Sequence, residues 1–182
     1  MRRAAVLFCS VMSLLISAGA LAQEPPSEAE APLAAAFKGA QHLAECTKAL
    51  DAACVVALSD ERSYWLWNGA KFDFAAKQAR FYAAMQKKGY KYLAFDTVAP
   101  QKLYVDGGRL YTFIPYVSTS NFGGEVSTLQ SYFIGFSRDG GDSWTFVSVG
   151  PEMTPDKIRL MVPSYNGQPL PESRWIDGRT SD

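Results

Sequence analysis

The stretch that most constrains the fold is 132–149, which reads YFIGFSRDGGDSWTFVSV. Two runs of aromatic and β-branched residues flank a tip rich in Gly and Asp, an order typical of two antiparallel strands joined by a turn. We therefore predict a β-hairpin here. Two earlier Gly-Gly turns, within 106–108 and 121–124, place this hairpin at the end of a series of strands.

The tip of this hairpin matches the pattern S-x-D-x-G-x-[ST]-W through Ser137, Asp139, Gly141, Ser143 and Trp144. It resembles the Asp-box turn found in the blades of sialidase-type propellers. The resemblance implies a structural turn and not an activity, because a propeller needs several copies and the motif lies away from the substrate. We expect Asp139 to accept hydrogen bonds from backbone N–H groups of the tip, Ser143 to help close the loop, and Trp144 to cover the base of the hairpin.

The second half of the chain predicts a bent antiparallel meander, with strands at 90–98, 101–105, 109–119 and 125–137 before the last strand of the hairpin. Pro115 lies inside the third strand. Because Pro donates no ladder hydrogen bond, we expect this strand to be an edge or to bulge at that point. Large residues alternate onto both of its faces, so one face should be covered by helices and the other by a pocket lining, the C-terminal segment or another subunit.

Helices are predicted before the strands. The Ala-rich segment 33–50 has apolar residues near helical spacing, 51–58 reads as a second short helix, and 59–69 adds a further helical turn. Asp73 is expected to cap a longer helix at 74–88, which Gly89 ends. After the strands, Thr154 caps a short helix with Pro155 at its first position, and 164–182 is expected to be an irregular arm.

Helices first and a bent meander afterwards define an α+β fold class. This order resembles the nuclear transport factor 2-like, or cystatin-like, cone superfamily, and in particular a group of its secreted bacterial members. The resemblance covers roughly 48–171 and implies a cone-shaped domain over 33–163 with a possible concave pocket, but no particular reaction. Its residues are Ala83-Ala84-Met85-Gln86 with Gly89, Leu110-Tyr111-x-Phe113-Ile114-Pro115-Tyr116, the blocks 131–137 and 139–147, Pro163 and Leu170-Pro171.

The N-terminus predicts an exported protein. Arg2 and Arg3 precede a mostly apolar run and then Ala20-Leu21-Ala22, the order of a secretory signal peptide cleaved after Ala22. The run is shorter than the roughly 20 residues of a membrane-spanning helix, although a retained anchor helix is the alternative. The acidic, Pro-rich segment 23–32 is expected to be disordered. We expect a periplasmic or secreted location without a membrane anchor, and Gln23 as the N-terminus of the exported protein would verify it.

Without Arg2 and Arg3, 16 basic residues stand against 18 acidic ones, a formal charge of −2. This balance gives no basic surface for nucleic acid and no cationic face for membranes.

Cys46 and Cys54 remain after cleavage, and in an oxidising compartment they are expected to form a disulfide worth roughly 2.5 kcal/mol. Two free buried thiols are the main alternative. No metal site is expected, because His42 is the only histidine and a structural zinc site needs four N or S ligands.

The aromatic residues suggest binding. Together with few candidate acids and bases, they favour a non-catalytic module for an unknown small ligand or a protein partner, and a homodimer through the sheet face is a further possibility. An alternative is an enzyme of the ketosteroid isomerase or scytalone dehydratase kind, with Asp96 as base and Tyr82, Tyr104 or Tyr132 as donor. Carbohydrate binding is a minor alternative, and no cofactor is expected. The candidate pocket residues are Tyr64, Trp65, Trp67, Tyr82, Tyr104, Tyr116 and Tyr132.

Overall fold

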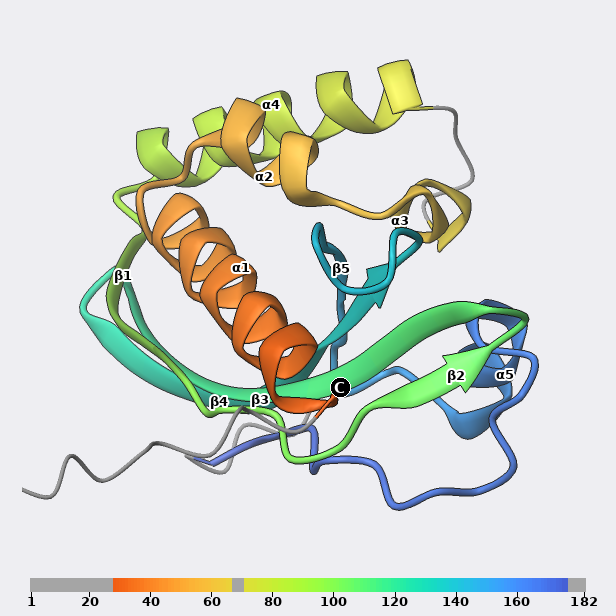
Figure 1. The fold of residues 1–182 in the computed structure, drawn as a ribbon. Coiled ribbons are helices and arrows are strands. Elements are labelled where there is room, and N and C mark those ends of the chain that lie inside the picture. Colours follow the sequence, from red (N-terminus) through yellow and green to blue (C-terminus); the bar gives the residue numbers. More distant parts are fainter. Residues whose placement is uncertain (1–27, 67–70, 177–182) are drawn as a thin grey trace, which may run out of the picture.

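The computed structural model describes residues 28–66 and 71–176. Helices come first and are followed by an open antiparallel sheet of six strands, so the chain is of the predicted α+β class (Figure 1). The expected leader 1–22 lies outside the described residues. The elements in chain order are α1 (Glu30–Lys48), α2 (Ala52–Leu58), α3 (Glu61–Leu66), α4 (Lys71–Lys87), β1 (Lys91–Thr97), β2 (Tyr104–Asp106), β3 (Arg109–Phe122), β4 (Glu125–Ser137), β5 (Thr145–Ser148), α5 (Pro155–Met161) and β6 (Arg174–Trp175).

The helix ends follow local capping chemistry. Asp51 accepts a hydrogen bond from the backbone N–H of Cys54 and caps α2, and Thr154 caps α5 in the same way, with Pro155 following as predicted. Gly89 has a φ of 74° and donates its N–H to the carbonyl of Gln86, and Tyr90 donates to the carbonyl of Met85. These two bonds form a Schellman motif at the end of α4.

Two predicted helix starts need correction. Helix α1 begins at Glu30, inside the segment expected to be disordered, with Ala29 at its N-cap. Pro32 is tolerated in the first turn, because the backbone N–H groups there have no intrahelical partner. Asp73 does not cap α4, which begins at Lys71. Its carboxylate instead lies in the first turn, where it faces the positive end of the helix dipole.

No helix in the described ranges combines the length and apolarity that crossing a membrane requires.

The sheet has the order β1-β3-β4-β5, and β2 also pairs with β3. Strands β1 and β2 therefore lie one after the other along the same edge of β3, β1 against 116–121 and β2 against 109–111. The hairpins β2–β3 and β3–β4 turn through Gly107-Gly108 and Gly123-Gly124, all at positive φ, as two-residue loops require.

Pro115 lies where β1 has ended and β2 has not begun. Its carbonyl accepts the N–H of Val98 at 2.8 Å, so its nitrogen also faces this gap and no ladder bond to β4 is lost. Strand β3 is thus neither an edge nor bulged, and its register with β4 runs unbroken from Leu110–Ser137 to Phe122–Glu125. The predicted edge or bulge at Pro115 is wrong. The missing N–H of Pro115 faces the gap between β1 and β2, where no strand needs it as a donor.

Both faces of the sheet are covered, as predicted. On the first, the side chains of Ile114, Phe133 and Phe146 pack against α1 and α2, with the whole sheet curving beneath α1 (Figure 1). On the second, Tyr111, Tyr132 and Ile134 pack against α5 and the segment that follows it, which includes the buried Tyr165. The C-terminal arm is therefore a cover for the sheet, and it ends by adding β6 beside Leu129 and Gln130 of β4.

Helix α1 approaches the sheet closely at Gly39. A Cβ atom placed on Gly39 would lie 2.8 Å from Cζ of Phe146, a residue that is 1 % exposed.

Cys46 of α1 is bonded to Cys54 of α2, so the predicted disulfide is confirmed and fixes the corner between these helices.

A buried ion pair connects α3 to the last strand of the hairpin. Asp60 and Arg62 have side chains that are 2 % and 7 % exposed, and their carboxylate and guanidinium groups lie 2.9 Å apart. Asp60 also accepts the hydroxyl of Thr145 at 2.7 Å, and Arg62 donates to the carbonyl of Met161 at 2.9 Å. The guanidinium lies 4.1 Å from the centre of the Phe136 ring. Every polar group of this pair therefore has a partner.

Candidate functional site

A cavity of about 560 Å³ lies between the helices and the first face of the sheet. Its walls are mainly aromatic and aliphatic, with hydroxyl groups between them. Helix α4 contributes one wall, the corner of α1 and α2 another, strands β1, β3 and β4 the floor, and the segment after β5 the rim. The lining residues include Phe74, Gln78, Phe81, Tyr82, Tyr92, Phe95, Tyr116, Ser118, Phe133, Ser148, Glu152 and Lys157.

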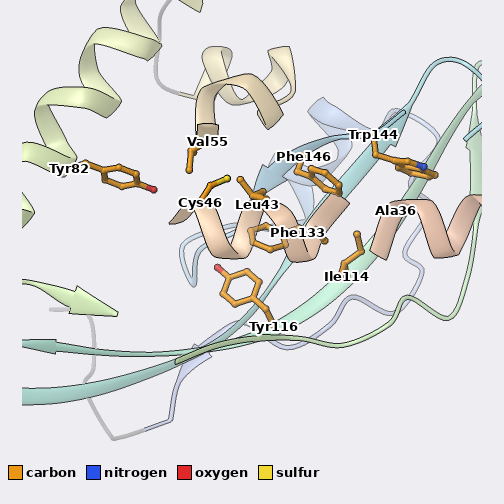
Figure 2. Packing of buried hydrophobic residues seen from close by; sticks show 11 residues of the cluster. Ala36, Leu43, Cys46, Val55, Tyr82, Ile114, Tyr116, Phe133, Trp144 and Phe146 are labelled. Atoms are coloured by element: carbon orange, nitrogen blue, oxygen red, sulfur yellow. The ribbon is translucent and has the colours of Figure 1, made fainter. Parts of the chain in front are cut away.

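Two of the predicted pocket tyrosines meet in this cavity. Tyr82 on α4 and Tyr116 on β3 are 5 % and 4 % exposed, and Figure 2 shows their side chains entering the same space from opposite sides, hydroxyls inward. Burial raises the pKa of both phenols; hydrogen bonds from Thr47 and Gln78 partly offset this for Tyr82, and those from Ser148 and Ser131 for Tyr116. Both side chains are therefore neutral phenols at physiological pH and can donate a hydrogen bond.

The Tyr116 hydroxyl belongs to a chain of polar contacts at the rim. It lies 3.4 Å from Oγ of Ser148 and donates to the carbonyl of Val149 at 3.4 Å. The same carbonyl accepts the hydroxyl of Ser131 at 2.6 Å, which in turn lies 2.8 Å from the hydroxyl of Ser173. Both contacts of the Tyr116 hydroxyl are long, so a ligand acceptor could compete with the Val149 carbonyl for its proton.

Several wall residues were not predicted. Tyr92 faces the cavity because β1 shifts register between Tyr92 and Ala94, which leaves Leu93 as an extra residue and brings Tyr92 and Phe95 onto one face. Burial, followed by the neighbouring Tyr90, raises the pKa of Tyr92. The rings of Phe95, Tyr116 and Phe133 form a packed floor, with centroids 4.6–5.9 Å apart.

Asp96, the predicted base, does not reach this cavity. Because of the same register shift it pairs with Val117, on the opposite face from Phe95 and Thr97, and its side chain is exposed. It borders a separate depression of about 250 Å³ with Glu45. The charged residues among the described lining of the large cavity are Glu152 and Lys157, both exposed at its rim.

The other predicted pocket residues lie elsewhere. Tyr64 belongs to α3 and packs on Phe74 of α4, and its hydroxyl donates to the carbonyl of Ser59 at 3.4 Å. Tyr104 stacks on Tyr111, and Tyr132 is buried on the same, second face under the C-terminal segment, where burial raises its pKa to about 12. The alternation of side chains along each strand is visible in the sequence. Which face of the sheet borders the cavity is not. The side chains of Trp65 and Trp67 lie outside the described residues.

The Asp-box tip is closed by its own side chains. Asp139 accepts the backbone N–H of Ser143 at 3.0 Å and the hydroxyl of Ser137 at 2.8 Å, and it also bonds the Ser143 hydroxyl. Gly141 donates its N–H to Ser137 at 2.8 Å, and the indole of the buried Trp144 donates to the Gly141 carbonyl at 2.9 Å. These contacts are internal to the turn, and none of its five residues lines the cavity.

Replacing Asp139 with Asn should make the protein less stable at pH 7 and flatten its acid denaturation. The hydrogen bonds from Ser143 hold the pKa of this carboxyl well below its usual range. A lowered folded-state pKa stabilises the fold above the unfolded pKa of about 4, and this contribution is lost as the pH falls toward the folded value. The Tm difference between wild type and Asp139→Asn should therefore shrink from pH 6 to pH 2. Asp142→Asn, on the same turn, controls for loss of a charge, and a pH-independent difference would contradict the expectation.

The cavity can enclose a small molecule and offer it phenol, hydroxyl and amide groups, but its described wall has no buried carboxylate or histidine for proton transfer. Among the described residues, His42, Cys46 and Cys54 form the one group of His, Cys or acidic side chains close enough to hold a metal ion, outside the cavity. Comparisons of this chain with protein-family models, with curated proteins and with solved structures found no match in any of the three.

Proposed function

We propose that this chain is a non-catalytic, secreted or periplasmic binding module for a small, largely apolar molecule, built on a nuclear transport factor 2-like cone. The observation that carries the proposal is the cavity of about 560 Å³ between the helices and the curved sheet. This volume falls within the range of about 300–1,000 Å³ typical of ligand sites. The helices-then-sheet order supports the cone fold, and the disulfide supports an oxidising compartment.

The wall chemistry defines the ligand. Phe95, Tyr116 and Phe133 offer ring faces and edges, which suit a flat or aromatic molecule. Tyr82 and Tyr116 remain protonated and donate hydrogen bonds, so the ligand should carry a hydroxyl, carbonyl or ether oxygen. Its enclosed part should be uncharged, because Glu152 and Lys157 stand at the rim and would meet only an exposed group.

The isomerase or dehydratase alternative is not favoured. Such chemistry needs a base within hydrogen-bond reach of the reacting carbon, and Asp96 lies on the opposite face of the sheet. Glu152 is exposed at the rim. Water solvates its carboxylate there, so the side chain lacks the burial that raises the pKa of a catalytic carboxyl group. Binding to a protein partner or to a second copy stays a separate prediction.

Equilibrium dialysis with 2-naphthol, a neutral hydroxylated ring compound, tests the proposal. We expect saturable binding of one molecule per chain. Tyr116→Phe should weaken it by about 2- to 10-fold, the loss of one hydrogen bond of about 0.5–1.5 kcal/mol. Ser118→Phe, which fills the floor, should abolish it while circular dichroism shows the fold retained.

Tyr104→Phe is the matched control, because it removes the same hydroxyl from the second face of the sheet. It should leave the affinity unchanged. Absence of saturable binding, or equal losses in Tyr104→Phe and Tyr116→Phe, would count against the cavity as the site.

A further inference from the structure

The disulfide lies against the only histidine of the chain. His42 and Cys46 are four residues apart on α1, so their side chains share one face of the helix. Nε2 of His42 lies 4.0 Å from Sγ of Cys46 and 3.7 Å from Sγ of Cys54. All three potential ligand atoms lie within 4.8 Å of one another. The imidazole therefore already faces both sulfur atoms.

These distances approach those of a tetrahedral metal site. With Zn–S of about 2.3 Å and Zn–N of about 2.0–2.1 Å, tetrahedral angles place N and S about 3.6 Å apart and two S atoms about 3.8 Å apart. The two N–S separations are within about half an ångström of that value. Metal binding is prevented in the oxidised protein because neither sulfur of the disulfide is a thiolate, the form of cysteine that binds Zn²⁺.

We propose that the reduced protein holds one Zn²⁺ through His42, Cys46 and Cys54, and that disulfide formation and metal binding are mutually exclusive states of this corner. A dithiol reductant transfers two electrons and two protons to the disulfide and itself becomes a disulfide. Zn²⁺ then binds the two sulfurs as thiolates and the neutral imidazole, releasing two protons. A disulfide oxidant reverses the step: it takes two electrons from the thiolates and two protons from solution and becomes a dithiol, while the Cys46–Cys54 bond re-forms and the ion is released. The thiolate and imidazole donors are those that Zn²⁺ prefers.

The surroundings leave room for such a site. His42 is exposed and Cys54 half-buried, whereas Cys46 is 6 % exposed and belongs to the core. With three protein ligands, the fourth coordination position of the ion would be open to water. A closed structural zinc site has four protein ligands. In either state the same two residues join α1 to α2, so the wall that Leu43 and Val55 give the cavity is kept in place.

Zn²⁺ titration of the full exported chain, with and without prior reduction by a phosphine under anaerobic conditions, tests the proposal. A competing chromophoric chelator reports affinity, and Co²⁺ reports thiolate coordination by its charge-transfer absorption. We expect one equivalent in the reduced protein and none in the oxidised protein. His42→Ala should weaken binding by at least about 10- to 100-fold, the loss seen even for outer-shell partners. Gln41→Ala, also exposed on α1, should not.

Reduction could also loosen the corner, and circular dichroism follows this. If the helical signal falls on reduction, Zn²⁺ should restore it in wild type and in Gln41→Ala but not in His42→Ala. The proposal is overturned if the reduced protein binds no Zn²⁺, or if His42→Ala binds and responds as wild type does.

Discussion

Asp60→Ala is expected to lower the free energy of unfolding by about 3–5 kcal/mol, the cost of breaking a buried ion pair by removing one partner. The guanidinium of Arg62 would remain buried without its carboxylate, held by the Met161 carbonyl and the Phe136 ring. The hydroxyl of Thr145 would also lose its acceptor. Because this pair joins α3 to β5 and α5, its loss should loosen all three elements together.

Urea denaturation followed by tryptophan fluorescence measures this effect. Asp156→Ala is the matched control, since Asp156 pairs with Arg159 on the exposed surface of α5, where an ion pair contributes about 0–1 kcal/mol. A double variant that also replaces Arg62 with Leu should recover part of the loss, because the uncompensated charge is gone. Equal small effects of Asp60→Ala and Asp156→Ala would show that the buried pair is not a principal stabilising contact.

Phe146→Ala should also destabilise the protein by about 3–5 kcal/mol, as expected when a buried ring is removed and leaves a cavity. The ring fills the space between α1 and β4. A Cβ on Gly39 would be 2.8 Å from it and a Cβ on Gly135 3.2 Å from it, so the backbone lies close to the ring at both of these positions. Neither Gly39 nor Gly135 has a side chain of its own that could move into the vacated volume.

Thermal denaturation compares Phe146→Ala with Leu160→Ala, an apolar residue of α5 that is 78 % exposed and should change stability by no more than about 0.5 kcal/mol. Gly39→Leu in the Phe146→Ala background offers a sharper check. This side chain would clash in wild type but can fill the space left by the ring, so the double variant should be more stable than either single variant. Additive losses would indicate that the contact between α1 and Phe146 is not the source of the effect.

Local chemistry made the elements predictable. The Gly-Gly pairs at 107–108 and 123–124 allow two-residue turns, Gly89 ends α4, and Thr154-Pro155 begins α5, because each signal depends on neighbours in sequence. The disulfide was predicted from the expected oxidising compartment and from the short spacing of Cys46 and Cys54. The start of α4 was missed because Asp73 is as favourable in the first turn of a helix as at its cap.

The site was harder to predict because it depends on which face each residue takes. One extra residue at Leu93 reverses the alternation of β1, which brings Tyr92 into the cavity and directs Asp96 away from it. Tyr104 and Tyr132 are as aromatic as Tyr82 and Tyr116, and the sequence does not show that α5 and the C-terminal segment cover the face on which they lie. The burial of Asp60 and Arg62 could not be predicted, because their local sequence does not show that the two side chains pair or that Thr145 of β5 contacts Asp60.

The gap at Pro115 also affects how this protein meets other molecules of its kind. A long uninterrupted edge strand presents a row of free backbone groups that can pair with another sheet and start aggregation. Here that edge is divided into β1, of seven residues, and β2, of three, and the part of β3 left between them includes Pro115, which has no N–H. The extra residue at Leu93 further disturbs the first of these pieces. This edge therefore presents two separate, irregular rows of backbone groups in place of one continuous row, which disfavours intermolecular strand pairing.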